Sequence, residues 1–307
     1  MRQAALVLAC ALVARGATCV LTVAGLGGDP EYERRFSTSA QQIERALRAS
    51  GGELRLETLG GQAATRERVR AVLEGFAGEC RRQDDLVLML IGHGAFDGEE
   101  YKFNVPGPDL TGSELAALLE RIPAAPQLVV NMTSASGASL ENLRRPNRVV
   151  ITATKSGFEK NATVFGRYWA EALGDPSADT DKNEAVSALE AFWYATRRTG
   201  EFYESQKRLA TEHALLEDTG SGEGSSAPAP ERGQGRLAAA FPLVRLGAAR
   251  VAANDPGKRV LLVKKNELER RIDELKYRKA AMTEAEYRKQ LMGLLVDLAR
   301  TQEELEK

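Results

Sequence analysis

The chain has 307 residues, of which 43% are hydrophobic and 28% are charged, and its formal net charge is -1. This composition is typical of an ordinary globular protein with room for one large domain and an appendage, or for two modest domains. Because the chain has no overall charge that would attract nucleic acid or anionic lipid, we expect neither as a partner.

The first residues, MRQAALVLACALVARGA, place Arg2 before an apolar run at 4–14 that small residues follow. This is the layout of a secretory signal peptide, so we interpret residues 1–17 as a leader that is cleaved after Gly16 or Ala17. A buried first strand or a short hydrophobic helix is the alternative. The run is too short to cross a bilayer and no other segment approaches that length, so we expect a secreted or periplasmic protein without membrane association after cleavage.

Short apolar runs alternate with stretches of helical spacing along residues 18–219. The expected strands are Cys19–Ala24, Glu53–Leu59, Leu86–Ile91, Leu128–Met132 and Val149–Ala153. The stretches between them space their apolar residues as amphipathic helices do. Strands that are apolar on both faces and alternate with helices indicate a mostly parallel sheet that is covered on both sides. The predicted fold class is therefore α/β, a three-layer sandwich.

The chain beyond the last of these strands is predicted to be helical and then irregular. We expect a helix around Thr163–Leu173 and a long one from about Val186 to Glu217, which would contain His213 as a packed structural side chain. The stretch at 220–236 is rich in Gly, Ser, Pro and Ala, and we interpret it as a flexible linker.

The C-terminal segment, residues 237–307, ends in two predicted helices. Their apolar stripes contain Leu268, Ile272 and Leu275 in one and Leu291, Leu294, Leu295, Leu298 and Leu305 in the other. Thr283 and Glu286 fit a capping box, so we expect a helical hairpin that turns near 281–283. Such a hairpin packs on its own domain, or it binds a partner helix or a second copy of the chain.

Two cysteines, Cys19 and Cys80, remain once a leader is removed. Cys19 begins an expected strand, and Cys80 ends the helix that precedes another. Strand starts and helix ends lie at the same edge of a parallel sheet, so a disulfide between these residues is possible. Two buried free thiols are the alternative. Neither cysteine lies at the edge where chemistry is expected.

Three expected loops leave the carboxyl edge of the sheet, where open α/β sheets bind their ligands. They are AGLGGDP after the first strand, GHGAFDG after the third and NMTSASGAS after the fourth. The first loop lacks the third glycine of a dinucleotide fingerprint and the Gly-Lys-Ser/Thr ending of a P-loop, so phosphate binding is not expected. The second loop carries His93, one of the two histidines in the chain.

The second and third of these loops resemble those of the caspase-like cysteine peptidases, above all the bacterial relatives of legumain. In that family a histidine follows the third strand, and the nucleophile is the cysteine of a motif similar to Ala-Cys-x-Ser-Gly after the fourth. The resemblance covers residues 18–219. It implies that His93 corresponds to the family histidine, Ser136 and Gly137 to the Ser-Gly pair, and Ser134 to the nucleophile.

The nucleophilic thiol of that family is absent, because no cysteine follows Cys80. A thiolate forms near neutral pH with little help, whereas a serine hydroxyl needs a base in direct hydrogen-bond contact and a third group that orients the base. No third residue can be named: Asp97 is close to His93 in sequence, but nothing in the sequence shows that it reaches the ring. We therefore expect a pseudopeptidase that binds a protein or peptide, with His93, Gly94 and Ser134 around a vestigial site.

Two alternative functions remain open. The first is an active peptidase in which Ser134 or Thr133 is the nucleophile and His93 the base, with backbone amides near Gly94 and Ser134 as oxyanion donors. The second is a structural or assembly protein that acts through its helical hairpin. In a purely structural loop, the hydroxyls at 133, 134 and 136 would cap the following helix, and His93 would be hydrogen-bonded within a turn. None of these functions requires a cofactor.

A separate polar cluster lies in DTDKNEAVSALE, residues 179–190. Its oxygen-bearing residues occupy positions one, three, five, nine and twelve of an EF-hand-type loop: Asp179, Asp181, Asn183, Ser187 and Glu190. Oxygen ligands at this spacing favour calcium. Glu184 stands at position six, where a glycine normally makes the left-handed turn, at a cost of about 1–2 kcal/mol. The alternative is an acidic loop that caps the following helix.

Overall fold

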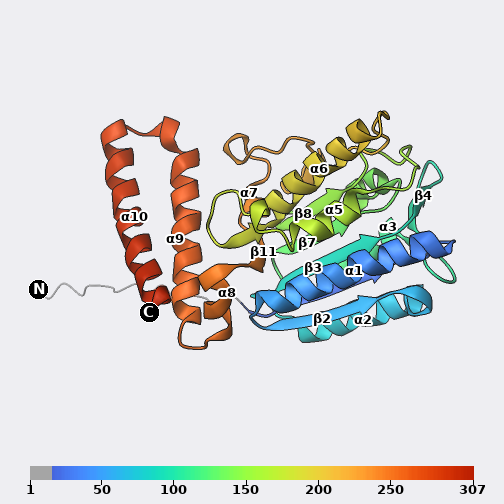
Figure 1. The fold of residues 1–307 in the computed structure, drawn as a ribbon, viewed down its shortest axis with the longest axis horizontal. Helices are drawn as coiled ribbons and strands as arrows, with labels where there is room; N and C mark the ends of the chain where they lie inside the picture. The colour runs from blue at the N-terminus through green and yellow to red at the C-terminus, as the bar shows by residue number, and fades with distance from the viewer. Residues whose placement is uncertain (1–15) are drawn as a thin grey trace, which may run out of the picture.

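The computed structural model describes residues 16–307, so nearly all of the expected leader at 1–17 lies outside the described residues. A six-stranded sheet forms the centre, in the order β10-β8-β7-β3-β1-β2 (Figure 1). β10 is antiparallel to β8, and the other pairings are parallel. The strands are β1 (Thr18–Ala24), β2 (Leu54–Leu59), β3 (Asp85–Ile91), β7 (Gln127–Asn131), β8 (Arg148–Thr152) and β10 (Leu215–Glu217).

The inner strands are apolar on both faces, and β3 shows why this fixes the architecture. All seven of its residues are buried, and alternate side chains join two different hydrophobic cores. Such a strand is stable only between two layers of helices. The five strands expected from the sequence are confirmed to within one residue at each end.

Helices cover both faces of the sheet. One layer consists of α1 (Pro30–Ser50), α5 (Phe165–Ala172) and α6 (Ala188–Ser205), and the other consists of α2 (Arg66–Glu79), α3 (Gly112–Glu120) and the short α4 (Leu140–Leu143). Each long helix buries one apolar stripe against the sheet, as Phe36, Ile43 and Leu47 do in α1. The predicted three-layer α/β sandwich is confirmed.

Short elements complete the sandwich. β4 (Gly94–Phe96), β5 (Tyr101–Phe103) and β6 (Leu110–Thr111) form a small antiparallel sheet beyond β3, and β9 (Ala185–Ser187) pairs with β11 (Pro242–Arg245). Single 3-10 turns lie at Gly61–Ala63, Ser136–Ser139, Pro176–Ala178, Pro230–Arg232 and Lys279–Ala281. None of these strands was expected, because two to four residues are too few for a periodic pattern.

The long helix expected from Val186 to Glu217 is wrong over its second half. α6 ends at Ser205, and Lys207 has a φ of 52°, a left-handed conformation that does not continue a helix. The chain then extends to form β10, whose backbone pairs with the otherwise free edge of β8. Pairing that edge outweighs the helical spacing that the sequence shows.

The last part of the chain forms the expected helical hairpin beside the sandwich (Figure 1). After α7 (Arg236–Ala239), β11 and α8 (Gly247–Asn254), the hairpin consists of α9 (Arg259–Tyr277) and α10 (Glu284–Glu306). Three α9 residues pack against Leu294 of α10: Leu268, Ile272 and Leu275. Thr283 and Glu286 form the expected capping box. Within residues 16–307, no helix combines the length and the apolar composition that crossing a bilayer requires.

The segment at 220–236 is irregular and is fixed at both ends. Ser225 forms an isolated bridge with Leu216, and the Asp218 carboxylate accepts hydrogen bonds from the backbone N–H groups of Gly235, Leu237 and Ala238. β11 then pairs with β9 of the sandwich. The flexibility of this linker stays a prediction.

The amino edge of the sheet is cross-linked. Of the two alternatives for Cys19 and Cys80, the structure has the disulfide. Close by, the Asp84 carboxylate accepts from the backbone N–H groups of Ala17 and Arg81. At the same edge the buried Arg148 guanidinium donates to the side chains of Gln127 and Glu120 and to the carbonyl of Leu143.

Candidate functional site

The carboxyl edge of the sheet brings the loops after β3 and β7 into contact, as the sequence predicts. His93 and Gly94 follow β3 after Gly92, and Thr133 and Ser134 lie just beyond β7. Because β3 and β7 are parallel neighbours, both loops leave the sheet on the same side. The contact between the loops is made by Ser134 and Gly94, residues 40 positions apart.

The Ser134 hydroxyl is bound on both sides by the backbone of Gly94. Its oxygen accepts from the Gly94 N–H at 3.1 Å, and its proton is donated to the Gly94 carbonyl at 3.1 Å. The residue is only 2% exposed. A hydroxyl has a single proton, so the proton that a general base would remove is already donated to a carbonyl. The Gly94 N–H, expected as an oxyanion donor, binds the serine oxygen instead.

His93 packs on α1. Its ring contacts the rings of Tyr32 and Phe36 edge-on, with centroid distances of 4.7 and 5.2 Å. Burial lowers the pKa of His93, and a hydrogen bond with the Gly27 backbone opposes this effect. In the part of the chain that the structure describes, no hydrogen bond joins His93 to Ser134.

Asp97 does not supply a third catalytic group. Its carboxylate pairs with Lys102 at 2.7 Å and accepts from the backbone N–H groups of Glu99 and Glu100. These contacts hold the pKa of Asp97 well below its usual range. Its hydrogen bonds stabilise the turn between β4 and β5, and none of those found within 16–307 reaches His93.

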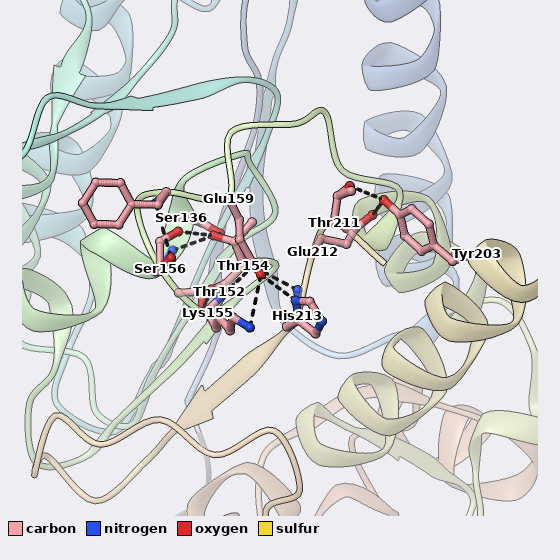
Figure 2. Close-up of polar contacts among 12 residues, drawn as sticks. Ser136, Thr152, Thr154, Lys155, Ser156, Glu159, Tyr203, Thr211, Glu212 and His213 are labelled. Carbon is pink, nitrogen blue, oxygen red and sulfur yellow. Dashed lines mark hydrogen bonds and ion pairs between the residues drawn. The ribbon is translucent and has the colours of Figure 1, made fainter. Parts of the chain in front are cut away.

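Thr133, the alternative nucleophile, is fully buried in a network of neutral groups. Its hydroxyl lies 2.6 Å from the Tyr101 hydroxyl and 2.8 Å from the Asn131 side-chain oxygen. Burial raises the pKa of Tyr101, so the phenol stays neutral and cannot act as a base near pH 7. Ser136 is also fully buried and bonds Thr154 at 3.1 Å, which joins the loops after β7 and β8 (Figure 2).

A cavity of about 990 Å³ opens beside this edge, on the face that α1 and α5 cover. Ile91 and Met132, at the ends of β3 and β7, line its inner part. Tyr32 and Phe36 line it as well and also contact the His93 ring. The cavity therefore adjoins the site that the sequence indicates.

Four arginines line this cavity: Arg34, Arg35, Arg167 and Arg208. Two carboxylates, Glu31 and Glu171, line it too, and Glu171 is paired with Arg198 at 3.2 Å. Among the residues described, none of the four arginines has an ion-pair partner, although Arg35 and Arg167 lie over tyrosine rings. The cavity therefore has an excess of positive charge. No local sequence pattern predicts it, because the arginines come from three separate segments.

The segment between α6 and β10 forms one wall of the cavity, and two carboxylates hold it in place (Figure 2). Glu212 accepts from the Val164 and Phe165 N–H groups at the start of α5, and burial raises its pKa. The His213 ring lies 2.5 Å from Glu159, and its side chain is 44% exposed. The prediction that His213 packs within a helix is therefore wrong, because the extended chain carries its ring to the surface.

The acidic loop at 179–190 lies at the opposite end of α6 from the cavity. Carboxylate oxygens of Asp179, Asp181 and Glu190 lie within 4.8 Å of one another. Glu184 has a φ of 67°, the left-handed conformation that position six of an EF-hand-type loop adopts. Burial, then repulsion from Glu190 and Asp179, raises the pKa of Asp181 to about 6.

The same loop also caps α6, which was the alternative to calcium binding. One Glu190 oxygen accepts from the Ser187 N–H and hydroxyl in a capping box, and the other accepts from Thr180. Capping therefore uses both oxygens of Glu190. It does not relieve the repulsion among the three carboxylates, which a cation would relieve.

Comparisons with known proteins concern the fold. No family model matches the chain, and no curated protein matches it either. Among solved structures, the chain is similar to protein GSU0716 from Geobacter sulfurreducens, with 13% identity and a TM-score of 0.42 over 70% of this chain and 95% of that one.

The chain is also similar to two insect caspases. The Drosophila initiator caspase Dronc has 12% identity and a TM-score of 0.42, over 67% of this chain and 81% of that one. Caspase-1 from Spodoptera frugiperda has 9% identity and a TM-score of 0.46, over 67% and 87% respectively. At these identities the likeness concerns only the arrangement of helices and strands.

Proposed function

We propose that the chain is an exported homologue of the caspase-like peptidases that has lost hydrolysis and binds a protein or peptide at the carboxyl edge of its sheet. The observation that carries this proposal is the pair of hydrogen bonds between the Ser134 hydroxyl and the Gly94 backbone. Export is supported by the disulfide between Cys19 and Cys80, because structural disulfides are typical of oxidising compartments and rare in the cytosol.

The geometry around Ser134 opposes nucleophilic attack at three points. The hydroxyl proton is donated to a carbonyl, the His93 ring packs on α1, and the Gly94 N–H is already used. A serine nucleophile needs a base within hydrogen-bond reach and free donors for the oxyanion. Hydrolysis would therefore require both loops to rearrange before a peptide could be attacked.

The cavity beside the site supports peptide binding and indicates the chemistry of the ligand. Its volume of about 990 Å³ is in the range of binding sites that enclose a ligand or a few side chains. Four arginines without carboxylate partners favour a ligand that carries negative charge, and guanidinium groups bind carboxylates with paired hydrogen bonds. The proposed ligand is a peptide segment with an acidic side chain.

The experiment measures binding and cleavage together. Fluorescent peptides that contain Asp or Glu are titrated with the protein and compared with the same peptides carrying Asn or Gln. Cleavage products are sought by mass spectrometry after long incubation. We expect binding of the acidic peptides without cleavage, and an affinity at least about tenfold lower for Arg34→Gln combined with Arg208→Gln, equal to about 1.4 kcal/mol.

Arg45→Gln is the matched control, because Arg45 is exposed on α1 and does not line the cavity. It should leave the affinity unchanged. Cleavage that Ser134→Ala abolishes would establish the active-peptidase alternative and end the proposal. Equal affinity for the acidic and the neutral peptides would rule out an acidic side chain as the feature that the cavity recognises.

We propose in addition that the acidic loop binds calcium. The proposal is supported by the spacing of Asp179, Asp181, Asn183 and Glu190 together with the left-handed conformation of Glu184. A bound calcium ion would stabilise the fold at the start of α6 and would take no part in peptide binding at the other end of that helix.

A further inference from the structure

α10 carries apolar side chains on two faces. One face packs against α9, with Leu294 buried and Tyr287, Leu291 and Leu298 partly buried. The other face contains Met292, Leu295 and Val296, which are 63%, 43% and 41% exposed. The sequence pattern predicts Leu295 in one stripe with Leu291 and Leu294, but the structure places it on this second face.

We call Met292, Leu295, Val296 and the exposed Ala299 the outer stripe. Their spacing of three, four and seven residues from Met292 puts all four on one face of a helix. Elsewhere within 16–307 the large exposed hydrophobic side chains occur singly along the chain, which is normal for a protein surface. α10 lies on the side of α9 away from the sheet (Figure 1), and the side chains of the outer stripe are exposed.

Opposite charges lie at the two ends of the outer stripe. Arg288 is one helical turn before Met292, and Glu303 is one turn after Ala299. Arg288 precedes Leu295 by seven residues, and Glu303 follows Val296 by seven. The face is therefore complementary to itself when a second α10 lies antiparallel to the first.

We propose that the outer stripe binds the outer stripe of a second copy of this chain. The two α10 helices cross antiparallel about a two-fold axis between Leu295 and Val296, with apolar side chains at the centre. Arg288 then lies beside Glu303 of the partner subunit at both ends of the contact. A parallel pair would instead place Arg288 of one copy beside Arg288 of the other, where like charges repel.

The charged groups are free to exchange partners. Arg288 now pairs with Glu284 at 2.5 Å, and Glu303 pairs with Lys307 at 2.9 Å, both on the exposed surface of the same helix. Exposed pairs of this kind contribute little to stability, so changing partner costs little. Because the apolar centre contains only four residues from each copy, the dimer is expected to be weak and to depend on concentration.

Sedimentation equilibrium of the full chain across a range of micromolar concentrations tests the proposal. We expect the wild-type chain to dimerise, and Met292→Ser with Val296→Ser to remove dimerisation. Arg288→Glu alone and Glu303→Arg alone should each weaken it at least about tenfold. The double variant that carries both reversals should dimerise again, because the exchange restores opposite charges across the axis.

Leu209→Ser is the matched control, since Leu209 is a 91% exposed leucine on the sandwich, far along the chain from α10. It should leave dimerisation unchanged. Circular dichroism checks that each variant keeps its helical content, which is expected because all substituted side chains are exposed. A monomer at every concentration would overturn the proposal. So would a dimer whose dissociation constant is unchanged by either charge reversal.

Discussion

The two edges of the central sheet use their polar residues in opposite ways. At the amino edge, a disulfide joins Cys19 to Cys80, and the buried Asp84 and Arg148 have their hydrogen-bond partners within the fold. At the carboxyl edge, the Ser134 hydroxyl is satisfied by the Gly94 backbone, but the arginines of the adjoining cavity have no carboxylate partner in the described chain.

This difference indicates that the polar groups of the amino edge stabilise the fold, whereas the arginines beside the carboxyl edge are available to bind a ligand. A group whose partners are all inside the fold contributes to folding and has nothing left for a ligand. Unpaired charge around a cavity contributes nothing to folding and favours a ligand of opposite sign. The carboxyl edge is therefore expected to act through its arginines, and its serine is expected to act as a structural residue.

The largest effect is expected at the amino edge. Cys80→Ser removes a cross-link between residues separated by 61 positions, which should lower the free energy of unfolding by about 4 kcal/mol. Urea denaturation under oxidising conditions measures the change. In the presence of a reductant the wild-type chain should lose the same amount and match the variant. Equal stability of the two oxidised proteins would contradict the prediction.

A smaller effect is expected from Ser134→Ala at the carboxyl edge. The change leaves the N–H and the carbonyl of Gly94 without their partner, at a cost of about 2 kcal/mol. Ser177→Ala, at an exposed serine, is the control and should change stability by less than about 0.5 kcal/mol. If Ser134→Ala left the unfolding free energy unchanged, the serine would not be the structural residue described above.

Calcium is expected to stabilise the wild-type chain at pH 7 by about 1.4 kcal/mol when its concentration is ten times Kd. Thermal unfolding with calcium and with a chelator measures this, and magnesium serves as the comparison ion. The effect should disappear in Asp181→Asn. It should also weaken as the pH falls through about 6, because the raised pKa leaves Asp181 protonated there. Stabilisation that Asp181→Asn leaves intact would place the ion elsewhere.

The smallest effect concerns the calcium-free protein. The pKa of Asp181 is raised from 3.8 to about 6, so the folded state binds its proton more readily than the unfolded state does. Wild-type stability should therefore fall as the pH rises from about 4 to 6. The loss should be less than about 1 kcal/mol, because the Asp181 side chain keeps enough contact with water for the solvent to screen the desolvation and the repulsion that raise its pKa. Asp181→Asn should lack this loss, so the variant should be the more stable protein at pH 7 and nearly equal at pH 4. Denaturant titrations at the two pH values compare them.

The sequence predicts the strands well because burial on both faces leaves a continuous apolar run. It does not predict β10, since Leu215–Glu217 continue a helical spacing in the sequence and form a strand only because they pair with the free edge of β8. The capping box at Thr283 is a local signal, and it is confirmed.

The candidate site is predictable from the sequence only in part. Strand order brings Ser134 near Gly94, but residue spacing does not reveal that the hydroxyl donates to a backbone carbonyl. The cavity arginines escape prediction because Arg34, Arg167 and Arg208 meet only in the folded chain. Contacts between distant segments depend on packing, which no local pattern encodes.

The buried Lys265 of α9 links the helical hairpin to the acidic loop. Its ammonium group donates to the Asn183 carbonyl at 2.5 Å and pairs with Glu269 at 3.0 Å. A divalent cation in the loop would lie close to the Lys265 ammonium group. The two positive charges would therefore compete for the same carboxylates and carbonyl oxygens of the loop.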